Sequence, residues 1–150
     1  MTKPNINNII FCEDDEDDRL FFKEITQELN SSIKVEFISD GFRLLQLLKH
    51  FVPDILFLDL EMPFKNGLEC LVEIRANANL ESLPIVIFSS TTRQANIQTS
   101  YEMGANLFLI KTPIYSEYSS SVKAVLNLDW SDPIAIKEQY CVNGRYTAFS

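Results

Sequence analysis

The segment Asp54-Ile55-Leu56-Phe57-Leu58-Asp59 places a continuous apolar run between two aspartates. A strand that is buried on both faces has such a run, whereas a strand with one solvated face alternates between apolar and polar residues. The segment therefore predicts a central strand of a parallel sheet. Asp59 stands at the carboxyl end of this strand, which is the edge where open α/β sheets bind ligands.

Short apolar runs on both sides of this segment alternate with amphipathic stretches. The expected strands are residues 6–12, 35–38, 54–59, 84–88 and 106–110, and the expected helices are residues 17–29, 42–51, 67–75, 92–103 and part of 115–128. In the first helix, Phe21, Ile25 and Leu29 are expected to lie on one face. Strand–helix alternation repeated five times predicts an α/β fold with a five-stranded parallel sheet and helices on both faces.

The composition is that of one folded, acidic domain. The 150 residues include 46% hydrophobic residues and carry a formal net charge of -8. This charge argues against nucleic-acid binding, which needs a basic face, and no apolar run approaches the ~18 residues of a membrane span. The three cysteines show no metal-ligand spacing, so reduced thiols and a cytoplasmic location are expected.

Polar residues follow four of the five expected strands. Glu13-Asp14-Asp15 follow the first strand, Asp59 the third, Ser89-Ser90 the fourth and Lys111 the fifth. In a parallel sheet these ends lie at one edge, where converging carboxylates repel one another unless a cation is present. Mg²⁺ prefers a few carboxylates together with water and phosphate oxygens, so the pattern favours a magnesium site.

Four motifs in this order resemble the receiver domain of two-component response regulators. They are the acidic residues after the first strand, "DLEMPFKNG" at 59–67, "SLPIVIFSS" at 82–90 and "GANLFLIK" at 104–111. The resemblance covers residues 6–128 and implies the doubly wound, flavodoxin-like strand order 2-1-3-4-5. Residues 129–150 remain as a C-terminal tail, which could form a short helix, a hairpin at Asn143-Gly144 or a frayed end.

The resemblance also implies the residues that handle a phosphoryl group. Asp59 would be the phosphoacceptor, Lys111 would pair with the phosphoryl oxygens and the Ser89 hydroxyl would hydrogen-bond one of them. Ser89 and Phe108 would form the switch, in which the aromatic ring swings inward when the hydroxyl residue moves. The family commonly has proline directly after the lysine; here Thr112 intervenes, so either the loop gains a residue or a cis bond lies between Thr112 and Pro113.

The metal ligands are implied in the same way. Asp14, Asp59 and the backbone carbonyl of Glu61 would bind Mg²⁺ directly, and Glu13 would order a metal-bound water. Asp15 is the alternative ligand. The rest of the acidic run would begin the first helix, where carboxylates favour the exposed N–H groups, with Asp17 and Asp18 facing solvent.

The implied function is that of a stand-alone receiver rather than a turnover enzyme. It would accept its phosphoryl group from a sensor histidine kinase or a histidine phosphotransfer protein and signal to a downstream protein. The surface of the fourth helix and fifth strand often forms dimers in this family, so a homodimer is among the expected assemblies. Two alternatives remain open: a Mg²⁺-dependent aspartyl-phosphate phosphohydrolase, and a receiver scaffold that is never phosphorylated. Such hydrolases typically have aspartate at the position of Glu61.

Overall fold

The fold is a five-stranded parallel sheet between two layers of helices, as seen in a computed structural model that describes residues 6–150. The strand order is β2-β1-β3-β4-β5, so the fold class and strand order are confirmed. The strands are β1 (Asn8–Cys12), β2 (Lys34–Ile38), β3 (Ile55–Leu58), β4 (Ile85–Ser89) and β5 (Leu107–Ile110). β3 lies in the centre of the sheet and all its residues are buried, in agreement with its continuous apolar run.

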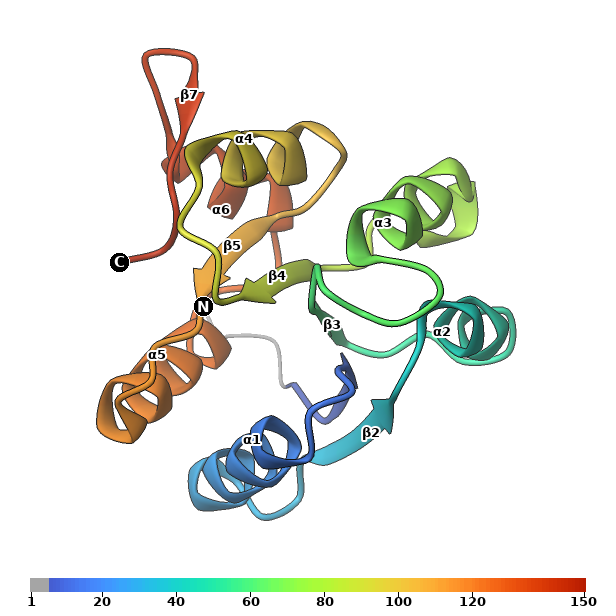
Figure 1. Ribbon diagram of the computed structural model, residues 1–150, viewed down its shortest axis with the longest axis vertical. Helices are drawn as coiled ribbons and strands as arrows, with labels where there is room; N and C mark the ends of the chain where they lie inside the picture. The colour runs from blue at the N-terminus through green and yellow to red at the C-terminus, as the bar shows by residue number, and fades with distance from the viewer. Residues whose placement is uncertain (1–5) are drawn as a thin grey trace.

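Helices cover both faces of the sheet (Figure 1). One face carries α1 (Glu16–Leu29) and α5 (Tyr115–Leu126), and the other carries α2 (Gly41–Leu48), α3 (Gly67–Ala76) and α4 (Gln94–Glu102), with the short 3-10 helix η1 (Ala78–Leu80) after α3. Side-chain caps define where several helices begin: Asp15 caps α1, Asp40 caps α2, and Asn66 forms a reciprocal capping box with Glu69 at α3. Such caps satisfy backbone N–H groups that the first turn leaves unpaired.

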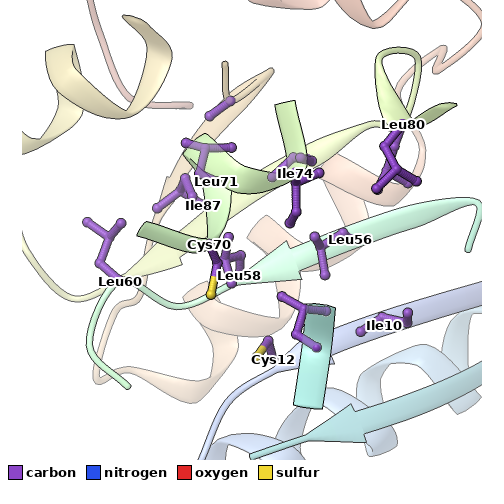
Figure 2. Close-up of a cluster of buried hydrophobic side chains, with 14 of the residues drawn as sticks. Ile10, Cys12, Leu56, Leu58, Leu60, Cys70, Leu71, Ile74, Leu80 and Ile87 are labelled. Atoms are coloured by element: carbon purple, nitrogen blue, oxygen red, sulfur yellow. The ribbon is translucent and has the colours of Figure 1, made fainter. Parts of the chain in front are cut away.

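Each face of the sheet has its own hydrophobic core. The core below α1 and α5 is rich in aromatic rings: the centroids of Phe11 and Phe22 are 4.6 Å apart, and those of Phe22 and Phe57 are 5.0 Å apart. The core below α2, α3 and α4 is mostly aliphatic, and Figure 2 shows Leu71 and Ile74 of α3 above the strands. Apolar burial on both faces keeps the strand ends at fixed positions.

The buried face of α1 is centred on Phe22 rather than on Phe21. Phe22 and Ile25 are fully buried, whereas Phe21 is 39% exposed. The expected grouping of Phe21, Ile25 and Leu29 on one face therefore did not identify the most buried residue of the helix. Phe21 and Phe22 are adjacent, and both fit a helical spacing to Ile25 and Leu29, so periodicity alone does not distinguish them.

The C-terminal tail is ordered into a helix and a hairpin that lie at the β5 edge of the sheet (Figure 1). It comprises α6 (Pro133–Gln139), β6 (Cys141–Val142) and β7 (Arg145–Tyr146). The Asn143-Gly144 turn joins the two short strands, and both residues have positive φ, at 53° and 77°. Ile136 and Phe149 pack with the core below α5, whereas Tyr146 packs with the core below α4, so the tail crosses the edge of the sheet.

Hydrogen bonds fix the tail to α4 and β5. The Phe149 N–H donates to the Phe108 carbonyl at 2.8 Å, and the Tyr101 hydroxyl donates to the Thr147 carbonyl at 2.9 Å. The same hydroxyl accepts from the Phe108 N–H at 3.0 Å. We define residues 145–150 as the C-terminal arm.

The loop after Lys111 contains no cis peptide bond. No peptide bond among residues 6–150 is cis, so the Thr112–Pro113 bond is trans and Thr112 extends the loop.

None of the helices within residues 6–150 has both the length and the apolar character needed to cross a bilayer.

Candidate functional site

Strand pairing brings Glu13 and Asp59 side by side at the carboxyl edge of the sheet. Cys12 of β1 pairs with Leu58 of β3, and the Asp59 N–H donates to the Cys12 carbonyl at 3.1 Å. The next residue along each strand is therefore one of the two carboxylates. Both are buried, with Glu13 1% and Asp59 6% exposed. The convergence that the sequence predicted for the ends of the first and third strands is present.

Three carboxylates form a group that could hold a metal ion. One ligand oxygen from each of Glu13, Asp14 and Asp59 lies within 4.8 Å of the other two. The Oε2 atom of Glu13 is buried and has no hydrogen-bond partner among residues 6–150. A buried carboxylate oxygen without a partner is costly, and a hard divalent cation would satisfy it. The donor set thus fits a divalent cation.

Lys111 extends from the end of β5 into this carboxylate group. Its N–H donates to the Ser89 carbonyl at 2.8 Å, which holds the residue beside the end of β4. Its ammonium forms ion pairs with Glu13 at 2.8 Å, Asp18 at 3.1 Å and Asp59 at 3.5 Å. Lys111 therefore joins the ends of β1, β3 and β5 to the first turn of α1.

Burial and neighbouring charges shift the pKa of both Glu13 and Lys111. Burial, with additional contributions from the carboxyls of Asp59 and Asp18, raises the pKa of Glu13 well above its usual range despite the nearby Lys111. For Lys111, burial alone would lower the pKa, but the negative charges of Asp59, Glu13 and Asp18 outweigh it and the pKa is raised. In the metal-free site, burial therefore favours the neutral form of Glu13, and the surrounding carboxylates favour the charged form of Lys111.

The loop after β3 is shaped around Asp59. The Glu61 N–H donates to Asp59 Oδ1 at 3.2 Å, while the Glu61 side chain is exposed. Gly67 begins α3, and its N–H donates to the Leu60 carbonyl at 3.0 Å. A cavity of about 300 Å³ lies between this loop and the loop after β4, and Glu61, Met62 and Thr91 are among its lining residues. The cavity thus borders the loop that carries Glu61, on the side of α4.

The acidic run is divided between the carboxylate group and the helix cap. Asp14 belongs to the group with Glu13 and Asp59. Asp15 caps α1 instead, since its Oδ1 accepts from the N–H groups of Asp17 at 2.8 Å and Asp18 at 3.2 Å. These bonds direct Asp15 toward the helix, which favours Asp14 over Asp15 as the candidate ligand.

Asp18 was expected to face solvent, and this prediction was wrong. Its side chain points toward the site and pairs with Lys111, whereas Asp17 is exposed. Asp18 is the third residue of α1, and the α1 backbone turns that position toward the end of β5. Counting acidic residues along the run could not reveal this, because the partner lies 93 residues away in the sequence.

Ser89 and Phe108 lie on adjacent strands, β4 and β5, two residues out of direct register. The Ser89 hydroxyl is buried and accepts from the Thr91 N–H at 3.3 Å. The Phe108 side chain is fully buried in the core below α4. The Phe108 ring is therefore already in the inward position, and this conformation is not the starting point of a swing from solvent into the core.

The fold and the site define the class of this protein. Residues 9–118 match the family model of the response regulator receiver domain. The chain therefore belongs to the response regulator receiver family, and its role is that of a phosphorylatable receiver in two-component signalling.

Relatives include a protein of similar length and a longer one. The chain is 23% identical to response regulator Rcp1 of Synechocystis sp. PCC 6803 over 85% of this chain and 91% of Rcp1. It is 30% identical to the Regulator of RpoS of Escherichia coli over 74% of this chain, but it spans only 32% of that protein.

Solved structures of response regulators share this fold. The phosphorylated cyanobacterial phytochrome response regulator RcpA superimposes with a TM-score of 0.79 at 25% identity, covering 85% of this chain and 96% of RcpA. The Mn²⁺-bound form of Rcp1 has a TM-score of 0.74 at 24% identity, covering 84% and 96%.

Proposed function

We propose that Asp59 is the phosphoacceptor of this receiver. The carrying observation is the convergence at one sheet edge of Asp59, the Lys111 ammonium and a Glu13 oxygen that has no hydrogen-bond partner in the described part of the chain. A carboxylate oxygen of Asp59 would attack the phosphorus of the donor. The bond from phosphorus to the donor breaks, the leaving group keeps that electron pair, and an acyl phosphate remains on Asp59.

We assign the metal site to Glu13, Asp14 and Asp59, together with the backbone carbonyl of Glu61. Mg²⁺ is the proposed ion because the donors are hard oxygens, which this cation prefers. When bound, the cation supplies positive charge beside the transferring phosphoryl group. By resemblance to the receiver family, Glu13 would bind the ion through a water.

The protein residues would neutralise and orient the phosphoryl group. Lys111 is charged and lies 3.5 Å from Asp59 Oδ2, so its N–H donors can turn to phosphoryl oxygens at that position. The Glu61 N–H, which donates to Asp59 Oδ1, holds the carboxylate in its orientation. The Ser89 hydroxyl would bond a third oxygen after the loop that follows β4 moves inward.

We propose Ser89 and Phe108 as the switch. Movement of Ser89 toward the phosphoryl group would alter packing against β5, where Phe108 is already inside the core. The proposed change is therefore a rearrangement within the core. Phosphorylation would favour the rearranged state to the extent that the phosphoryl group interacts more strongly with that state than with the original one.

The proposed partners are a sensor histidine kinase or a histidine phosphotransfer protein as donor, and a downstream protein as target. A homodimer and a cytoplasmic location remain predictions. We also propose residues 6–128 as the receiver domain and residues 129–150 as an accessory segment at its β5 edge.

Family membership favours a receiver over a phosphohydrolase, and the pairing of the acidic group with Lys111 favours a phosphorylated receiver over a silent scaffold.

Incubation with acetyl phosphate and Mg²⁺, followed by intact mass and peptide mapping, tests this function. We expect one phosphoryl group on Asp59, and none after Asp59→Asn. Asp54→Asn is the matched control, because Asp54 lies beside the opposite end of β3 and accepts from the N–H groups of Asn7 and Asn8. Labelling of the Asp59→Asn protein at the parent level would place the acceptor elsewhere. Multiple turnovers of the donor, without a stable adduct, would favour the phosphohydrolase.

A further inference from the structure

The first turn of α1 holds Asp18 in a fixed position facing the site. Asp15 caps the Asp18 N–H at 3.2 Å, and the Tyr118 hydroxyl of α5 lies 3.5 Å from the Asp18 carbonyl. The Asp18 side chain is 21% exposed, and its Oδ2 lies 3.1 Å from Lys111 Nζ. The N–H and the carbonyl of Asp18 are thus held in place while its carboxylate contacts Lys111.

The three carboxylates around Lys111 are not equivalent. A lysine ammonium has three N–H donors, and here it faces Glu13 at 2.8 Å, Asp18 at 3.1 Å and Asp59 at 3.5 Å. Glu13 and Asp59 belong to the carboxylate group that could hold a metal, whereas Asp18 does not. When a cation and a phosphoryl group occupy the site, Asp18 is the one of these three carboxylates still committed to Lys111.

We infer that Asp18 is a positioning residue for Lys111, an inference that rests on the proposed function. Asp18 holds one N–H donor of the ammonium toward α1 while the other two turn from Glu13 and Asp59 to the phosphoryl oxygens. The Lys111 stem is long and flexible, and the Phe88 ring, with its centroid 5.6 Å from Nζ, lies beside the same ammonium. Asp18 and Phe88 together limit the positions that the charge can take.

The role predicts a specific kinetic pattern for Asp18→Asn. A hydrogen bond to a charged group corresponds to about tenfold to a hundredfold in an equilibrium constant, and partial exposure places the effect at the lower end. With acetyl phosphate as donor, we expect the maximal rate of Asp59 phosphorylation to fall about tenfold. The donor concentration at half-maximal rate and the Mg²⁺ affinity should stay unchanged, because Asp18 lies outside the group of carboxylates that could hold the metal.

Asp17→Asn is the matched control. Asp17 precedes Asp18 in the same turn of α1 and is exposed. Asp17→Asn therefore removes one negative charge near the same end of the helix without removing a contact to Lys111. Circular dichroism verifies that both variants fold. The ¹H–¹⁵N signal of the Lys111 ammonium gives a second readout, and Asp18→Asn should shift or broaden it while Asp17→Asn leaves it unchanged.

Three results would overturn the role of Asp18. These are an equal rate in the two variants, a faster rate in Asp18→Asn, or a Mg²⁺ affinity that falls in step with the rate, which would make Asp18 a metal ligand. The proposed function fails separately, if Asp59→Asn is still phosphorylated. A parent protein labelled on Asp59, together with an unaffected Asp18→Asn variant, refutes only the present inference.

Discussion

Gly67, the first residue of α3, lies directly against the backbone carbonyl of Asp59. A Cβ atom at Gly67 would overlap the Asp59 oxygen and would stand 2.8 Å from Leu60 Cα and 3.0 Å from the Asp59 carbonyl carbon. All three neighbours are backbone atoms, which cannot rotate away as a side chain can. The start of α3 thus fixes the backbone of the candidate phosphoacceptor.

Gly67→Ala should destabilise the protein and slow its phosphorylation. Alanine favours helix over glycine, so any loss reflects the overlap with Asp59, and overpacking of this kind costs about 1–3 kcal/mol. Urea denaturation measures the stability, and acetyl phosphate labelling measures the rate. Gly144→Ala is the comparison: its Cβ meets nothing within 4 Å, although its φ of +77° adds backbone strain. Equal labelling rates in the two variants would contradict the positioning of Asp59 by Gly67.

Tyr101→Phe should loosen the C-terminal arm. The change removes the hydroxyl that joins the Phe108 N–H to the Thr147 carbonyl, and it leaves a buried N–H unpaired at a cost of about 1–3 kcal/mol. Hydrogen exchange at the Phe149 amide should become faster. Tyr115→Phe serves as the control, because its hydroxyl is 3.4 Å from Glu24 on the surface. An unchanged Phe149 exchange rate in Tyr101→Phe would show that other contacts suffice to hold the arm.

The stability of the metal-free protein should fall as pH rises. Burial raises the pKa of Glu13, so the folded protein keeps a proton that the unfolded chain loses above about pH 4.5. Unfolding then releases a proton, and the free energy of unfolding decreases with pH by at most about 1.4 kcal/mol per unit. This loss continues until the pH reaches the raised pKa that Glu13 has in the folded protein. Glu13→Gln should therefore flatten the dependence of the unfolding free energy on pH between about pH 5 and pH 9, which lies roughly between the unfolded and folded pKa values of Glu13.

Urea denaturation across this range, with a chelator present, measures the effect of Glu13. Glu16→Gln removes an exposed glutamate from the same acidic run and serves as the control for net charge. A Glu13→Gln protein with the same pH slope as the parent would rule out Glu13 as its source.

Arg75→Lys should destabilise the connection between α3 and β5. The Arg75 guanidinium donates at 2.8 Å to the carbonyls of Leu80, Leu83 and Gly104, and at 2.9 Å to the Asn106 side chain. Lysine lacks this planar set of donors, so some of these three carbonyls lose their hydrogen-bond partner. The free energy of unfolding should fall by about 2 kcal/mol or more. Arg43→Lys is the control in urea denaturation, since Arg43 is exposed and pairs with Asp40 at 3.5 Å. Equal losses of stability in the two variants would show that the bonds made by Arg75 contribute no more than the exposed pair of Arg43 and Asp40.

The sequence predicted the sheet well because each strand end carries its own signal. The apolar run before Asp59 indicated a central strand, and the structure places β3 there. Parallel pairing then brings Glu13, Asp59 and Lys111 together irrespective of their distance along the chain, since all three follow carboxyl ends of strands. Residues fixed by strand position were therefore accessible to prediction, whereas their roles remain proposals.

Residues whose position depends on rotation about a helix axis were less accessible. The choice between Phe21 and Phe22, and the direction of Asp18, both depend on how α1 turns relative to β5 and α5. The neighbouring sequence does not distinguish Asp18 from Asp17, because the two residues are adjacent and differ only in the direction in which the helix points their side chains. The contacts of the arm with Tyr101 and Phe108 likewise join segments that are far apart in sequence and have no shared motif.

The arm also covers part of the outer edge of the sheet. An edge strand with free backbone groups is a template for adding a further strand, and in this sheet the Phe149 N–H occupies the Phe108 carbonyl at the outer edge of β5. While the arm stays in place, the Phe108 carbonyl is already paired within the chain, so a strand of another chain would have to displace the arm to pair with it. A fluorophore attached at Ser150 would be tethered beside the strand that leads to Lys111, and would make a convenient optical reporter of that edge.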